Sequence, residues 1–257
     1  MPIEPTPTAA AGTVLVTGGS RGIGAATALL CAARGWAVAV NYAQDAAAAH
    51  AVVERIVAAG GNALALQADV ADEAQVAVMF ARLDAALPPL AGLVNNAGVV
   101  DRAARVDAMD GARLQRMFAI NVFGSFFCAA QALRRLSTRH GGRGGAIVNV
   151  SSVAARLGSP GQYVDYAAAK AAIDTFTIGL AREVAAEGVR VNAVRPGIVD
   201  TGIHASGGQP DRVARVAATL PMQRAGTADE IAHAIVWLLS GEASYASGAI
   251  VDVSGAR

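Results

Sequence analysis

Cysteine and excess charge are both scarce in this sequence of 257 residues. The two cysteines, Cys31 and Cys128, lie far apart in segments of helical composition. Their separation predicts neither a disulfide framework nor a cysteine-based metal site, and it favours a reducing, cytoplasmic setting. Basic and acidic side chains number 21 and 20, which leaves a formal net charge of +1. This small charge provides no overall field that would attract nucleic acid or an anionic membrane.

Long hydrophobic runs are also lacking, although 54% of the residues are hydrophobic and the mean hydropathy is +0.40. A membrane-spanning helix needs about 20 consecutive apolar residues. The best candidate stretches are interrupted by charged residues, namely Arg34, Arg55, Arg82, Lys170 and Arg182. The opening MPIEPTPTAAAG has neither a basic nor an apolar region, so residues 1–12 are predicted to be a loose tail rather than a signal peptide. We therefore expect no membrane association.

What the sequence has is an alternation of short β-branched runs with longer segments rich in alanine and leucine. The short runs are apolar on both faces, as strands of a parallel sheet are when helices cover both sides. Strands are predicted at 13–17, 37–41, 64–68, 92–96, 146–150, 189–194 and 249–253. Helices are predicted near 22–33, 46–59, 73–86, 110–138, 165–187 and 228–240, with N-caps at Asp45, Asp72 and Asp110. This order predicts an α/β fold with a doubly wound parallel seven-stranded sheet, in a single domain over 13–257.

A glycine-rich turn, TGGSRGIG over 17–24, connects the first predicted strand to the first predicted helix. Such a turn places free backbone N–H groups and the positive end of a helix dipole at one point, which suits a pyrophosphate. Gly18 permits the tight turn, Gly22 permits close approach of a ligand, and Gly24 permits close packing of helix on strand. The spacing differs from the standard G-x-G-x-x-G, so the turn alone does not establish a dinucleotide site.

The same turn also matches G-x-S-x-G, the nucleophile turn of α/β-hydrolases, with Ser20 as the nucleophile. A serine hydrolase is therefore an alternative function. Two features disfavour it: the turn follows the first strand, so no earlier strand loop supplies a second oxyanion-hole N–H, and nothing marks His204 or His233 as a base. A protein that binds a dinucleotide without catalysis is a third hypothesis.

The end of the second strand bears on the choice of cofactor. NAD-binding folds place an Asp or Glu there to accept the ribose hydroxyls, whereas this sequence has Asn41 and Tyr42. Asp45 is better explained as a helix cap. Arg21 lies inside the glycine turn, and a cation without a competing carboxylate favours a 2′-phosphate. These residues favour NADP over NAD.

The stretch YVDYAAAK over 163–170 contains two tyrosines and a lysine. A free tyrosine has a pKa of about 10, and a nearby ammonium group lowers it by stabilising the phenolate. Tyr166 and Lys170 are four residues apart and share one face of a helix. Tyr163 is seven residues from Lys170 and follows Pro160 and Gly161, which indicate a loop. The spacing therefore favours Tyr166 as a proton donor.

The chain resembles the short-chain dehydrogenase/reductase family along nearly its whole length. Seven motifs carry the resemblance and occur in the order of that family: TGGSRGIG, ADV (68–70), NNAG (95–98), Asn121 in AINVFG, NVSS (149–152), YAAAK (166–170) and RPGIVDT (195–201). The resemblance implies a Rossmann fold and an NADP(H)-dependent oxidoreductase that interconverts a carbonyl and an alcohol. Its relatives of this kind include 3-oxoacyl carrier-protein reductases and sugar or steroid dehydrogenases.

The resemblance also implies roles for individual residues. Tyr166 would act as acid and base, Ser152 would bond the substrate carbonyl, Lys170 would hold the nicotinamide ribose, and Asn121 would help hold a water molecule. Thr201 would bond the nicotinamide carboxamide. The implied cofactor-binding residues are Gly18, Ser20, Arg21, Gly22, Ile23, Gly24, Asn41, Tyr42, Asp69, Val70, Asn96, Ala97, Gly98, Tyr166, Lys170, Pro196, Gly197, Ile198, Val199 and Thr201.

One departure from the family pattern concerns the loop before the tyrosine. Ser152 stands one residue farther from Tyr166 than the family spacing implies, and we expect the extra residue to bring Tyr163 toward the substrate. Ser151 is the alternative serine, but adjacent side chains after a strand point to opposite sides. The motif NVSS favours Ser152. Tyr163 as a substrate contact and Tyr163 as a packing residue are both open.

The sequence names no substrate beyond a small carbonyl or alcohol compound. Arg102 and Arg105 could dock an acyl carrier or could be solvated loop charges. A second basic cluster precedes the fifth strand, and its cations are better explained as complements to a helix C-terminus than as a nucleic-acid site: Arg134, Arg135, Arg139 and Arg143. The resemblance suggests a homotetramer built through the helices predicted at 110–138 and 165–187.

Overall fold

Seven parallel strands form one sheet in the computed structural model, which describes residues 12–257. The strand order is β3-β2-β1-β4-β5-β6-β7, so the direction of winding reverses between β1 and β4. The strands are β1 (Thr13–Val16), β2 (Ala37–Tyr42), β3 (Ala63–Gln67), β4 (Leu90–Asn95), β5 (Gly145–Val150), β6 (Val189–Pro196) and β7 (Ile250–Val253). The predicted doubly wound parallel sheet is confirmed. The predicted tail lies outside the described residues, apart from Gly12.

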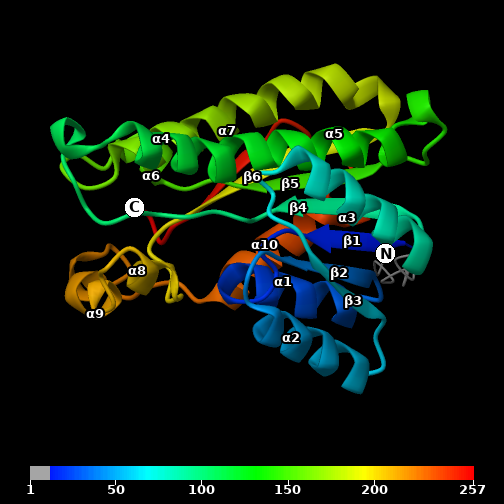
Figure 1. Cartoon of the computed structure of the whole chain (residues 1–257), viewed down its shortest axis with the longest axis horizontal. Helices are drawn as coiled ribbons and strands as arrows, with labels where there is room; N and C mark the ends of the chain where they lie inside the picture. Colours follow the sequence, from blue (N-terminus) through cyan, green and yellow to red (C-terminus); the bar gives the residue numbers. More distant parts are fainter. Residues whose placement is uncertain (1–11) are drawn as a thin grey trace, which may run out of the picture.

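Helices cover both faces of this sheet, which explains why its central strands are apolar on both sides (Figure 1). One face is covered by α1 (Gly22–Ala33), α2 (Ala46–Ala58) and α10 (Ala228–Leu239). The other is covered by α3 (Glu73–Ala86), α5 (Gly124–Leu136) and α7 (Val164–Val184). Each layer encloses its own apolar cluster, with Ile56 and Ile235 buried in the first and Phe80 and Leu93 in the second.

The three predicted N-caps form as expected. The carboxylates of Asp45, Asp72 and Asp110 accept backbone N–H bonds from the first turns of their helices. Each cap satisfies donors that a helix start otherwise leaves without partners. A fourth cap, the capping box of Thr227 and Glu230 at α10, has the same physical basis but was absent from the sequence prediction.

The helix predicted over 110–138 is interrupted near its middle. It divides into α4 (Gly111–Phe118), a π-helical turn (Ala119–Phe123) and α5. The turn contains Asn121, whose side-chain amide donates to the carbonyl of Met117 at 3.0 Å. Widened turns of this kind often mark functional positions. The whole stretch Gly111–Leu136 is long and apolar enough to cross a membrane by length and composition, but its packing against β4 and α7 accounts for that character.

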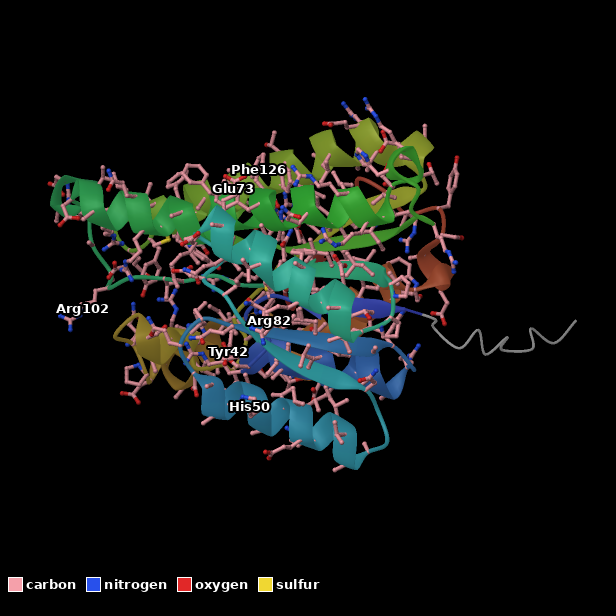
Figure 2. All side chains as sticks on the ribbon, turned by 45° about the vertical axis from the view of Figure 1, so that its right-hand side comes forward. Tyr42, His50, Glu73, Arg82, Arg102 and Phe126 are labelled. Carbon is pink, nitrogen blue, oxygen red and sulfur yellow. The ribbon has the colours of Figure 1, made fainter. Side chains whose placement is uncertain are left out.

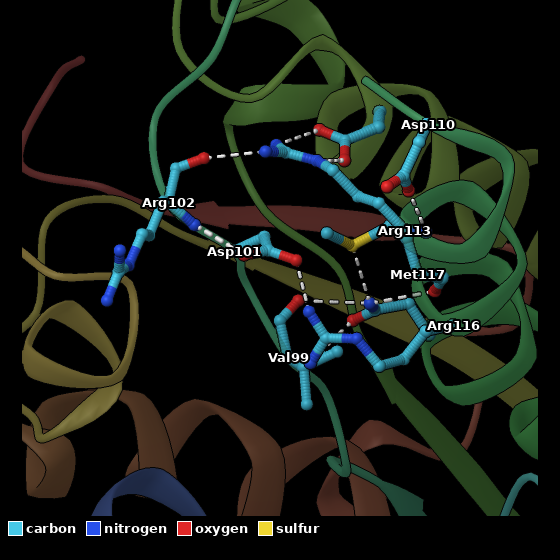
Figure 3. Close-up of polar contacts among 9 residues, drawn as sticks. Val99, Asp101, Arg102, Asp110, Arg113, Arg116 and Met117 are labelled. Carbon is cyan, nitrogen blue, oxygen red and sulfur yellow. Dashed lines mark hydrogen bonds and ion pairs between the residues drawn. The ribbon is translucent and has the colours of Figure 1, made fainter. Parts of the chain in front are cut away.

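An ion pair fixes the start of α7 to α4 (Figure 3). The guanidinium of Arg113 donates to both carboxylate oxygens of Asp165, at 2.7 and 3.2 Å. Its third bond reaches the carbonyl of Arg102 at 2.7 Å. The Asp165 side chain is fully buried, so the pair depends on this two-pronged geometry to offset desolvation. Because Asp165 immediately precedes Tyr166, the pair also fixes the position of that tyrosine.

Candidate active site

The candidate site lies at the carboxyl ends of the strands, where winding reverses, which is where open α/β sheets bind ligands. A cavity of about 160 Å³ opens there. It is lined by residues that follow β4, β5 and β6 and by residues of α7, among them Asn96, Ser152, Tyr166, Lys170 and Gly197. A single water needs roughly 10–15 Å³ by the same measure, so the space suits a small molecule.

The glycine turn is clamped to the end of β4. The amide of Asn96 donates to the carbonyls of Thr17 and Gly18, at 2.8 and 3.0 Å. In return the Thr17 hydroxyl accepts the backbone N–H groups of Asn96 and Ala97, both at 3.0 Å. A side chain at Gly24 would place its Cβ 2.3 Å from the Gly18 carbonyl. The turn therefore requires glycine at 24, as the sequence predicted, and presents the start of α1 to a ligand.

Asn41 contributes to this turn in a way that the sequence did not predict. Its side chain is buried, accepts the N–H of Gly18 at 3.2 Å, and donates to the carbonyls of Leu66 and Ala68. The amide is therefore engaged inside the protein. Asn41 thus ties the turn to β2 and β3, and its implied role in cofactor binding stays a prediction.

The remaining predicted cofactor residues lie around the same edge. Arg21 is exposed at the N-cap of α1. Tyr42 ends β2 beside His50, with ring centroids 6.4 Å apart (Figure 2). Asp69 is exposed after β3, and Val70 is buried against Gly124, where an added Cβ would lie 2.7 Å from it. These positions thus lie at the carboxyl ends of the neighbouring strands β3, β2 and β1.

The two serines after β5 both line the cavity but differ in burial and in hydrogen bonding. Ser151 is buried, and its hydroxyl donates to the carbonyl of Lys170 at 3.1 Å. Ser152 is partly exposed in the cavity beside Tyr166. Burial raises the pKa of Tyr166 to about 12, the reverse of the lowering that the spacing to Lys170 predicted, while the Ser152 hydroxyl acts against this rise. At neutral pH the phenol is therefore protonated and able to donate.

Lys170 is the only lysine in the sequence, and it is buried. Its Nζ donates to the carbonyl of Val150 at 2.7 Å and lies 5.6 Å from the centre of the Tyr166 ring. Burial lowers the pKa of Lys170 to about 8, and the charge of Asp174 partly opposes this change. The amine thus remains largely charged at neutral pH, close to the phenol that it is positioned to influence.

A chain of charges extends from Asp174 away from the cavity. Its Oδ2 accepts from Nε and Nη2 of Arg195, at 2.9 and 2.8 Å. Arg195 also contacts Asp252 at 3.4 Å, and Asp252 pairs with Arg156. The Oδ1 atom of Asp174 is buried and has no hydrogen-bond partner in the part of the chain that the structure describes. Asp174 is consequently held in place by Arg195, near Lys170.

Asn121 lies against the lysine side of the cavity. Its amide donates to the carbonyl of Val99 at 3.0 Å, and its oxygen accepts the N–H of Val99 at 3.2 Å. A side chain at Gly98 would approach Asn121 Oδ1 to 2.8 Å and Lys170 Nζ to 3.4 Å. Gly98 therefore keeps open the space that separates these two polar groups.

The far wall of the cavity follows β6. Pro196, Gly197, Ile198, Val199 and Thr201 all line it. Thr201 also faces the glycine turn, since an added Cβ at Gly22 would lie 3.3 Å from its methyl group. The residues predicted to contact the nicotinamide thus line the same cavity as Ser152, Tyr166 and Lys170.

Comparison with known proteins agrees with this arrangement. A family model described as enoyl-(acyl carrier protein) reductase matches residues 18–255. The oxidoreductase YgfF of Escherichia coli K12 is 57% identical over 243 residues, which cover 95% of this chain and 98% of YgfF. The chain belongs to the short-chain dehydrogenase/reductase family.

Two further members of the family show the range of similarity. A 3-oxoacyl-[acyl-carrier-protein] reductase of Synechocystis is 39% identical, with 94% of each chain covered. A solved short chain dehydrogenase from Burkholderia cenocepacia J2315, in complex with NADP, is 35% identical. It superposes with a TM-score of 0.84 over 94% of this chain and 96% of that chain. The present chain is accordingly an oxidoreductase with the Rossmann-type fold of this family.

Membership in this family also bears on the hydrolase alternative. Ser20 does follow a strand, but neither His204 nor His233 forms a hydrogen bond with it among residues 12–257. His204 bonds the carbonyl of Val199, and His233 bonds that of Asp229. The glycine turn therefore lacks the base that a serine nucleophile requires.

The sequence did not identify several residues at the other end of the cavity. His204, Arg212 and Arg257 line it together with Tyr163. The first two belong to short helices, α8 (Ile203–Ser206) and α9 (Arg212–Val216), within a segment for which the sequence predicted no structure. Tyr163 is buried at the N-cap of α7. The extra residue in the preceding loop thus coincides with a tyrosine in the cavity wall.

Since Lys170 is the only lysine, its titration can be observed directly. In protein labelled with ¹³C at lysine Cε, one side-chain NMR signal should titrate near pH 8 rather than near 10.5. Asp174→Asn removes a charge that favours the ammonium form, so the pKa should fall further. Asp84→Asn, at a partly exposed carboxylate elsewhere, should leave it unchanged. A midpoint of 10 or above, or no response to Asp174→Asn, would contradict this electrostatic description.

Proposed function

We propose that the protein is an NADP(H)-dependent oxidoreductase that interconverts a carbonyl and an alcohol, with Tyr166 as the acid and base. One observation carries the proposal: Ser152, Tyr166 and Lys170 line one cavity together with Pro196–Val199 and Thr201. The glycine turn fits a dinucleotide, because Gly18 and Gly22 have positive φ and leave the start of α1 uncovered.

The residues divide the chemistry among them. When bound, the nicotinamide supplies the hydride. Ser152 holds the substrate carbonyl by a hydrogen bond, and the protonated Tyr166 donates to the oxygen as negative charge develops there. The ammonium of Lys170 stabilises the resulting phenolate. Asn121, next to Lys170, holds a water molecule that returns the proton.

The direction of the two pKa shifts supports this division. Burial holds the Tyr166 proton in place, with a pKa of about 12, so the phenol is the correct form for reduction at neutral pH. The pKa of Lys170 at about 8 leaves most molecules with a charged amine at the same pH. A charged lysine and a protonated tyrosine coexist below pH 8, which is the state that proton donation requires.

Tyr166→Phe should abolish turnover, by a factor of at least about 10², while leaving the Kd for NADPH nearly unchanged, because the phenol acts on the substrate. Tyr163→Phe should retain substantial turnover, since its hydroxyl accepts a bond from Gln209. Tyr245→Phe, at a fully exposed ring, is the matched control. Steady-state assays over a panel of carbonyl compounds measure turnover, and NADPH fluorescence measures binding. Loss of activity in Tyr163→Phe with retention in Tyr166→Phe would reverse the assignment.

We propose NADP rather than NAD as the preferred cofactor. No carboxylate ends β2, and Arg21 is exposed at the turn where a 2′-phosphate would lie. A hydrogen bond to a charged group contributes about 1.5–3 kcal/mol, or roughly ten- to a hundredfold in affinity. The solved relative from Burkholderia cenocepacia, which carries NADP, supports the same choice.

NADPH should accordingly bind at least about tenfold tighter than NADH. Arg21→Ala should erase most of that difference, whereas Arg34→Ala, at the exposed opposite end of α1, should preserve it. Fluorescence titrations with both cofactors give the two Kd values. Equal affinities in the unaltered protein would show that Arg21 is a surface residue without a role in cofactor choice.

We further propose a cytoplasmic homotetramer that associates through α5 and α7. Phe126 on α5 (Figure 2) and Ile178 on α7 are exposed, as is Phe123 in the adjoining π-helical turn. Phe126 stacks on Phe176 with ring centroids 3.9 Å apart. An apolar surface of this kind is typical of an interface. Light scattering should therefore give four times the mass of the chain at micromolar concentration. A stable monomer would contradict the assembly.

A further inference from the structure

The end of the cavity farthest from the glycine turn is basic. His204, Arg212 and Arg257 line it, and no aspartate or glutamate among residues 12–257 does. In Figure 1, α8 and α9 lie together at this end of the molecule, with the C-terminus beside them. Burial lowers the pKa of His204, which leaves it neutral at pH 7. The charged side chains at this end are therefore Arg212 and Arg257.

Within the described part of the chain, the groups that hold Arg212 are neutral. Its Nη1 donates to the side-chain oxygens of Gln162 and Gln209, at 2.8 and 3.1 Å. Its guanidinium carbon lies 5.5 Å from the centre of the Tyr163 ring. Gln209 is held in turn by Arg215, which donates to it at 2.6 Å. These contacts orient the guanidinium without neutralising its charge.

One edge of the Arg212 guanidinium remains available. Nε and Nη2 of Arg212 form no hydrogen bond with any residue in 12–257. None of the ion pairs among these residues includes Arg212. Arg257 forms no ion pair with a described residue either, and its pKa is lowered by burial and by the charge of Arg212. Two like charges in one partly enclosed space are unfavourable, and an anion placed with them would relieve the repulsion.

We propose that Arg212, together with Arg257, binds a carboxylate of the substrate, so that the enzyme acts on oxo acids and their hydroxy-acid counterparts. The Nε–Nη2 edge of an arginine matches the two oxygens of a planar carboxylate. The site shares its cavity with Ser152 and Tyr166, so one small molecule can present its carbonyl to the tyrosine and its carboxylate to the arginines. The carboxylate is unchanged by the reaction. The inference rests on the proposed carbonyl reduction.

The test compares acids with their neutral esters. With saturating NADPH, kcat/KM is measured for 4-oxopentanoate and 4-oxocyclohexanecarboxylate and for the methyl ester of each. At least one acid should exceed its ester by about ten- to a hundredfold, the range expected for a charge-assisted pair. Esters that are reduced as fast as the acids would overturn the proposal while leaving the reductase function intact.

Variants of Arg212 test whether the preference for the acid over the ester depends on this residue. Arg212→Gln should remove most of the preference for the acid while the ester rate changes little. Arg212→Lys should retain part of that preference, because lysine keeps the positive charge but lacks the paired N–H donors of a guanidinium. Arg182→Gln, at an exposed arginine on α7, is the matched control. Thermal melting verifies that each variant is folded. Equal losses for acid and ester in Arg212→Gln would indicate a structural role for Arg212 and overturn the inference.

Binding separates this proposal from the proposed reaction. If no carbonyl compound is reduced, calorimetry of 4-oxocyclohexanecarboxylate with the NADP⁺-loaded protein gives an independent readout. Binding that is weakened at least about tenfold in Arg212→Gln would support the carboxylate site although the reaction had failed. Absence of binding, or binding that Arg212→Gln does not affect, would overturn the site itself.

Discussion

Burial of a single amine is the constraint on which the candidate site depends. Lys170 is the only lysine among 21 basic side chains, and the others are arginines. A guanidinium cannot lose its proton in proteins, whereas an amine shifts its pKa readily when buried. Burial brings Lys170 to about 8, and a carbonyl at the end of β5 together with the charge of Asp174 retains the ammonium form. Position 170 therefore requires lysine, because the surrounding structure can shift the pKa of an amine but not that of a guanidinium.

Two ion pairs in the surrounding structure hold the helix that carries Tyr166 and Lys170. Asp165 and Arg113 hold the first turn of α7, and Asp174 and Arg195 hold its second half against β6. Tyr166 and Lys170 lie between these two pairs, on the same helix. Breaking either pair would leave a charge buried and unpaired, which costs several kcal/mol, about 3–5 by measured examples. The spacing of tyrosine and lysine is therefore enforced from both ends of their segment.

The sequence predicted the sheet and most of the site because those features depend on local patterns. Apolar strands, aspartate caps and the glycine turn are encoded in neighbouring residues, and the order of the motifs placed Ser152, Tyr166 and Lys170 together. Features that depend on distant residues were inaccessible. Asn41 could not be recognised as a clamp for Gly18, because its other partners, Leu66 and Ala68, lie on β3 and just after it. Likewise, the π-helical turn at Asn121 has no compositional signal within an apolar helix.

The end of the cavity that Arg212 and Arg257 line also depends on contacts between residues that are distant in the sequence. The Arg212 guanidinium is oriented by Gln162 and Tyr163, which precede it by some fifty residues, and by Gln209 from its own segment. No single segment carries a recognisable motif, and the arginine looks like an ordinary surface charge in the sequence. Only the fold shows that neutral amides and an aromatic ring surround it, so that no described residue compensates its charge. An arginine held this way is suited to an anionic ligand, because partners that orient it without neutralising it leave its strongest interaction for the substrate.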